Sequence, residues 1–90
     1  FTTVVLLDKG EVLDLDASNR VRIRIGGLKQ PLDVQRLPGD RFLVAEHGGG
    51  RVTERTKDGE IAWEFEARGP LAAQRLANGN TVIVNCHAGP

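Results

Sequence analysis

A stretch of about twenty residues occurs twice in this chain, and no other feature limits its fold as strongly. PLDVQRLPGDRFLVAEHGGG begins at Pro31, and PLAAQRLANGNTVIVNCHAG begins at Pro70. The shared PL-x-x-QRL segments lie 39 residues apart. An extra turn residue near Asn78 is expected to move later matches to 40, so that His47 corresponds to His87. A period near 40 residues indicates a repeat architecture.

The N-terminal part is an earlier copy of the same unit. With the offset of 40, TVVLLDKGEVLDLDASNRVRIRI aligns with LVAEHGGGRVTERTKDGEIAWEF, and Gly10 falls on Gly50. The segments RVRIRI and EIAWEFE alternate apolar and charged residues with a period of two, which is typical of β-strands. Asp58-Gly59 and Asn78-Gly79 predict hairpin turns, because these dipeptides accept positive φ. Each full copy is therefore expected to hold four short antiparallel strands.

Three units of unequal length follow from this pattern. They are a partial unit over residues 1–30, a full unit over 31–69 and a partial unit over 70–90. The first supplies three strands, the second supplies four and the third supplies two. The strands of the two partial units are expected at Thr3–Leu7, Glu11–Leu15, Arg20–Ile25, Ala73–Leu76 and Thr81–Val84. A four-stranded antiparallel unit of about 40 residues is typical of a β-propeller blade, so we expect an all-β fold of about two blades.

The segment PLDVQRLPGDRFLVAEHGGGRV followed by KDGEIAWEFE resembles the repeats of quinoprotein-like and NHL-like bacterial β-propellers. Residues 31–90 carry most of the resemblance, and residues 1–30 match more loosely. The resemblance implies a propeller fold. It does not assign chemistry, because propellers host many unrelated functions. Such propellers are often exported, which favours a periplasmic or extracellular location, although no export signal is visible in the sequence.

The composition excludes several kinds of partner. Twelve basic residues balance twelve acidic ones, so no charge excess attracts nucleic acid. No apolar run reaches the roughly 18–20 residues of a membrane helix, so membrane insertion is not expected. The Gly48–Gly50 run lacks the lysine and helix of a phosphate-binding loop, so we interpret it as a tight turn. The single cysteine cannot form an internal disulfide.

Two blades cannot cover their own apolar faces, so the sequence predicts a partner. One solution is a ring of identical chains, for example three chains giving six blades; the other is a longer chain that holds the remaining blades. In a ring, the strands Thr3–Leu7 and Thr81–Val84 compete for one place, so one of them is surplus. We therefore expect a noncatalytic scaffold or binding module without a cofactor. The alternative is an enzyme, or a metal-binding quinoprotein-like propeller, whose site needs further blades.

Two sets of residues are candidates for binding. His47, Cys86 and His87 are a candidate metal site, because imidazole and thiolate bind zinc, although adjacent strand residues point to opposite faces. The simpler interpretation is polar loop residues kept by duplication. A second set lies on the first strand of each blade, which normally lines the central channel. Its members could bind polar ligands there or form hydrogen bonds between blades; they are Gln35, Arg36, Gln74 and Arg75.

Overall fold

The computed structural model describes residues 1–85 and contains nine strands in that range. The expected all-β character, the antiparallel pairing and the number of strands are confirmed. Two one-turn 3-10 helices, η1 and η2, were not predicted, and each follows a strand and ends at a glycine. The elements are β1 (Thr2–Leu6), η1 (Leu7–Lys9), β2 (Glu11–Leu15), β3 (Val21–Ile25), β4 (Pro31–Leu37), β5 (Arg41–Glu46), η2 (His47–Gly49), β6 (Arg51–Arg55), β7 (Ile61–Glu66), β8 (Pro70–Arg75) and β9 (Thr81–Asn85).

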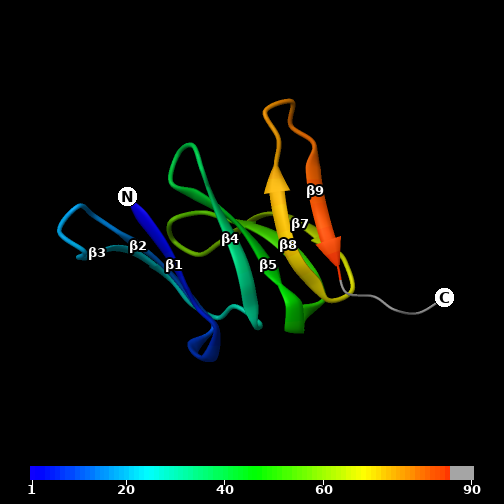
Figure 1. The fold of residues 1–90 in the computed structure, drawn as a ribbon, viewed down its shortest axis with the longest axis horizontal. Coiled ribbons are helices and arrows are strands. Elements are labelled where there is room, and N and C mark those ends of the chain that lie inside the picture. Colours follow the sequence, from blue (N-terminus) through cyan, green and yellow to red (C-terminus); the bar gives the residue numbers. More distant parts are fainter. Residues whose placement is uncertain (86–90) are drawn as a thin grey trace.

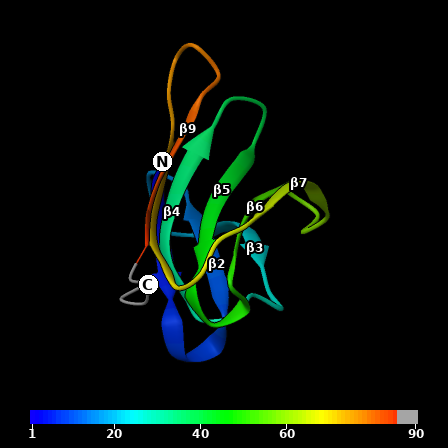
Figure 2. The same cartoon turned by 90° about the vertical axis from the view of Figure 1, so that its right-hand side faces the viewer.

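The strands form three separate antiparallel sheets (Figure 1). The first sheet has the order β1-β2-β3, the second has β4-β5-β6-β7, and the third has β8-β9. Strand β4 packs against β1 of the first sheet, and β8 packs against β4 and β5 of the second. Figure 2 looks along the stack and shows the sheets one behind another. Within residues 1–85, only the middle sheet therefore has neighbours on both of its faces.

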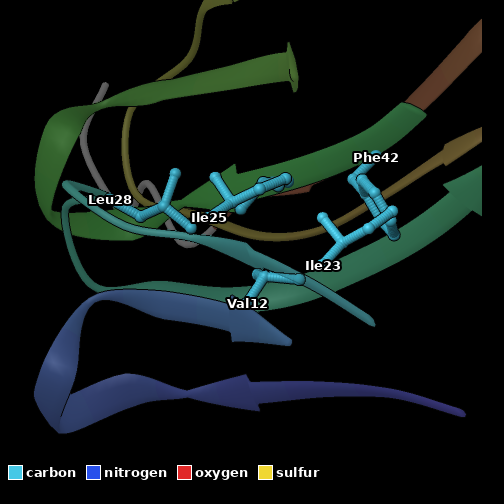
Figure 3. Close-up of a cluster of buried hydrophobic side chains, with 6 residues drawn as sticks. Val12, Ile23, Ile25, Leu28 and Phe42 are labelled. Atoms are coloured by element: carbon cyan, nitrogen blue, oxygen red, sulfur yellow. The ribbon is translucent and has the colours of Figure 1, made fainter. Parts of the chain in front are cut away.

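A cluster of apolar side chains joins the first sheet to the second (Figure 3). Successive side chains of a strand point to opposite faces of the sheet, so alternate side chains of β2 and β3 point toward the middle sheet and pack against β5. Phe42 and Val44 of β5 are fully buried in this cluster. The other buried members are Val12, Ile23, Ile25 and Leu28.

A second cluster joins the middle sheet to the third. It takes the side chains of β5 that point the other way, Leu43 and Ala45, together with Val52 of β6. Leu37 of β4 and Ala73 of the third sheet complete it, with Trp63 and Ile83 at its border. Strand β5 is thus buried on both faces, which explains its unbroken apolar run.

The offset of 40 predicted beyond Asn78 is wrong for the β8–β9 hairpin, where the spacing remains 39. Arg36 pairs with Phe42 in the middle sheet, and Arg75 pairs with Thr81 in the third. Phe42 therefore corresponds to Thr81, at the same spacing of 39 that relates the two arginines. No residue is inserted in this turn. The longer spacing arises earlier. Counted from the equivalent residues Ile25 and Phe65, the segment 26–30 before β4 is one residue longer than the segment 66–69 before β8.

Glycine is required at two equivalent positions, Gly10 and Gly50, which end the 3-10 turns with φ of 63° and 62°. At Gly10 an added Cβ would also collide with the carbonyl oxygen of Leu28, whereas at Gly50 the nearest atom is the Ala67 oxygen at 3.8 Å. The Leu28 backbone is fixed in place, because its N–H donates to the Gly10 oxygen at 3.0 Å.

We predict that Gly50→Ala lowers the free energy of unfolding by about 1–2 kcal/mol, the cost of a left-handed alanine. Gly10→Ala should lower it by about 1–3 kcal/mol more, because the Leu28 peptide must move and its hydrogen bond is lost. Urea unfolding followed by circular dichroism measures both variants. Equal losses at the two positions would contradict the close contact at Gly10.

Candidate functional site

Several polar side chains of β4 and β8 form contacts between the sheets. The Gln35 side chain on β4 reaches the backbone of β8, where its Nε2 donates to the Arg75 oxygen at 3.2 Å and its Oε1 accepts from the Arg75 N–H at 2.6 Å. Asp33 accepts from the Ala73 N–H at 3.2 Å in the same way. For Gln35 the structure therefore shows hydrogen bonding between sheets. Gln74, its counterpart on β8, is exposed.

The arginines of the same segment pair with carboxylates of the preceding sheet. Arg75 Nη1 lies 3.0 Å from Glu54 Oε1, and its guanidinium stands 5.0 Å from the centre of the Trp63 ring. Arg36 Nε lies 3.5 Å from Asp14 Oδ1 in the equivalent place. Both β4 and β8 are thus linked to the preceding sheet by an ion pair from their arginine.

Two carboxylates near these contacts, Glu54 and Asp40, are kept ionised by their arginine partners. Burial acts to raise the pKa of Glu54, but hydrogen bonds from Arg41 and Arg75 outweigh it and hold the pKa below its usual range. Arg22 of β3 contacts both Asp14 and Asp40 at 2.7 Å, and its hydrogen bond lowers the pKa of Asp40. Arg22 therefore connects β3 to the middle sheet through Asp40.

A buried glutamate that the sequence analysis missed lies between the first and middle sheets. Glu46 is fully buried at the end of β5. It accepts from Thr53 Oγ1 at 2.5 Å, Arg55 Nη2 at 3.0 Å, Arg51 Nη2 at 3.1 Å and the Lys29 N–H at 3.1 Å. Burial acts to raise its pKa, and these hydrogen bonds together hold the pKa below the usual range.

The signal for this cluster was present in the sequence. Glu46 ends the apolar run FLVA. The equivalent residue is Leu6 in the first copy and, by the ladder register, Asn85 in the last copy. An acidic residue at a position that is apolar in another copy suggests a buried charge with its own partners. Because the carboxylate oxygens are already saturated, we interpret the cluster as a structural element and not as a binding site.

The candidate metal site is only partly described. His47 lies in η2, and its Nδ1 is buried without a hydrogen-bond partner. Cys86 and His87 lie outside the described residues. Within residues 1–85 no group of three or more His, Cys, Asp or Glu side chains is arranged to hold a metal ion.

Equivalent apolar positions differ sharply in exposure between the middle and third sheets. Leu43 of the middle sheet is 0% exposed, whereas its counterpart Val82 is 47% exposed. Leu37 is 9% exposed and its counterpart Leu76 is 37% exposed. The free face of the third sheet is therefore chemically similar to a face that is buried one sheet earlier.

An open groove lies beside the third sheet, which has two strands where the middle sheet has four. It has a volume of about 690 Å³ and lies between β7 and the β8–β9 hairpin. Phe65 in this groove is 54% exposed, although its counterpart in the first sheet, Ile25, is 1% exposed because the middle sheet covers it. The groove is lined by Trp63, Phe65, Arg75, Gly79, Asn80, Thr81 and Ile83.

Comparisons with known proteins give no family assignment: no protein-family model matches the chain, and no curated protein matches it. In the described part of the chain no helix has the length and apolar character needed to cross a membrane.

Gln35 and Gln74 offer a matched test of the contacts between sheets. We predict that Gln35→Ala lowers the free energy of unfolding by about 1–3 kcal/mol, because both polar backbone groups of Arg75 lose their partner. Gln74→Ala should change it by less than about 0.5 kcal/mol in dilute, monomeric protein, because Gln74 is exposed. Denaturant titration measures both, and an equal effect at the two positions would contradict a role specific to Gln35.

Proposed function

We propose that the chain is a β-propeller segment that acts as a noncatalytic scaffold or binding module by assembling with copies of itself. One observation carries the proposal. Positions that are buried between neighbouring sheets, such as Leu43 and Ile25, recur as exposed residues: Val82 on the third sheet, and Phe65 on the part of the middle sheet that the third sheet does not cover. Covering these side chains with another sheet is favourable, because it removes apolar surface from water.

The two incomplete sheets have complementary parts. The first sheet lacks a strand of the β4 type beside β1, and the third lacks strands of the β6 and β7 types beside β9. Strands from two chains therefore supply one complete four-stranded sheet. Each chain then contributes two sheets to the ring, and three chains give six, within the range of about four to eight blades that propellers use.

The repeated polar contacts support stacking in a fixed order. Gln35 and Arg75 each connect one sheet to the next in the chain. Gln74 presents the same amide on the free face of β8, where it would bond to β4 of a following copy. The scaffold needs no cofactor, because the contacts between sheets are made by the chain's own side chains.

Light scattering at a series of protein concentrations tests this proposal. Three chains should give three times the chain mass of 9.8 kDa. Leu13→Lys should reduce this mass to that of one chain, because Leu13 lies on the outward face of the first sheet, half-buried and opposite Val4. Leu13→Ile, which keeps an apolar side chain at this position, is the control and should keep the oligomer. A well-folded wild-type monomer at every concentration would contradict the proposal.

A further inference from the structure

We propose that β8 of one copy pairs with β1 of a second copy and that β9 is the strand displaced. This inference rests on the proposed function and adds which strands meet, in which register. Both β1 and β9 correspond to β5 of the middle sheet, so only one of them fits into the shared sheet. The structure distinguishes them by how firmly each is held.

Strand β1 is anchored to the rest of the chain. It packs against β4, and Val5 borders the first core cluster. Thr3 Oγ1 donates to Asp14 Oδ1 at 3.2 Å. Phe1, immediately before the strand, lies under the guanidinium groups of Arg22 and Arg36 at 4.3 Å and 4.8 Å. Removal of β1 would break all of these contacts.

Strand β9 is held mainly by its ladder to β8. Val82 and Val84 are 47% and 53% exposed, and Ile83 alone borders a core cluster. Within residues 1–85 the side-chain hydrogen bond that reaches β9 is donated by Arg75 Nε to Thr81 Oγ1 at 2.8 Å, and Arg75 belongs to β8 of the same hairpin. Exchange of β9 for β1 of a second copy replaces one antiparallel ladder with another of similar length. The exchange therefore loses few side-chain contacts.

The exchange also fills the groove. Beside β1 of the second copy lie its β2 and β3, in the places where β6 and β7 stand in the middle sheet. The outward face of that first sheet carries Val4, Leu13 and Leu15, which are half-buried, and the exposed Val21. These apolar side chains would cover Trp63 and Phe65. The occupant of the groove is thus the first sheet of a second copy, in continuity with the stacking inside one chain.

The register follows from the middle sheet. There Asp33 pairs with Ala45, and Arg36 pairs with Phe42. Transfer of these pairs to equivalent positions places Ala72 opposite Val5 of the second copy. In the single chain Ala72 faces Val84, and Val5 faces Val12. The opposite exchange, with β1 displaced, would place Val84 opposite Val12 of the second copy.

Disulfide trapping between mixed single-cysteine variants separates the two exchanges. All variants carry Cys86→Ser, and each keeps the full chain. Ala72→Cys is mixed with Val5→Cys, and Val84→Cys is mixed with Val12→Cys as the matched pair. Each pair is unfolded together, refolded, assembled and oxidised. Opposed strand residues lie within the Cα separation that a disulfide spans, about 4.4–6.8 Å.

We expect a covalent dimer on a non-reducing gel from the first mixture, at least about tenfold above that from the second mixture. Either variant oxidised alone is the control for random collision. If the variants are oligomeric by light scattering but the second pair crosslinks, or neither does, the strand assignment is wrong while the proposed function stands. If the variants and the wild type are monomeric and no pair crosslinks, both are wrong.

Discussion

Replacement of Leu43 with alanine should lower the free energy of unfolding by about 2–5 kcal/mol, and we expect this to be one of the two largest effects in the chain. Leu43 is fully buried on the face of β5 that meets the third sheet. It packs with Val52 and Ala73, which come from two different sheets. Removal of three carbons leaves a cavity between the two sheets, and the surrounding side chains relax only partly to fill it.

Val82→Ala is the matched control for this prediction. Val82 corresponds to Leu43 by the ladder register but is 47% exposed. Its truncation should lower the free energy of unfolding by less than about 1 kcal/mol. Thermal and urea unfolding of both variants measures the difference. Comparable losses would show that the third sheet's free face is not the uncovered equivalent of the buried one.

Removal of the buried carboxylate of Glu46 should have a similarly large effect. Glu46→Ala leaves Arg55, which is 6% exposed, without the acceptor that it now contacts at 3.0 Å. Loss of one member of a buried ion pair typically costs about 3–5 kcal/mol. Glu64→Ala, which removes the exposed partner of Arg51, is the control and should cost less than about 1 kcal/mol.

The pH dependence of this effect tests its origin. Because the pKa of Glu46 is lower in the folded chain than its ordinary value, its contribution is present at neutral pH and is lost as the pH falls through the folded-state value. The difference in unfolding free energy between the wild type and Glu46→Ala should therefore shrink in acid, below the ordinary range of a glutamate. A difference that is constant down to about pH 2 would indicate a packing effect instead of a charge effect.

Strand positions were predictable from the sequence because the alternation is strict. Ile23 and Ile25 recur every second residue, and burial on one face of a sheet is enough to explain such a pattern. The turns were predictable for a similar reason, because Gly59 and Gly79 adopt the positive φ that their dipeptides allow. Both signals are local, so a single copy of the repeat already contains them.

Contacts between distant residues were less predictable. The partners of Glu46 come from β6 and from the connection before β4, and no periodic pattern in the sequence links them. The offset of the last repeat was predicted wrongly at the turn that contains Gly79. Residue type matches Gly79 with Gly39, whereas the ladder register matches it with Asp40, which also has a positive φ. Residue type alone could not decide between two registers that differ by one residue.

Fluorescence of Trp63 tests most directly whether the ends of the stack are covered by another copy. Trp63 is the sole tryptophan and lines the open groove, so the signal reports on that surface. We predict that acrylamide quenches it weakly at high protein concentration, and that dilution makes quenching several-fold stronger as copies separate. Strong quenching that does not change with concentration, in a folded chain, would contradict the account.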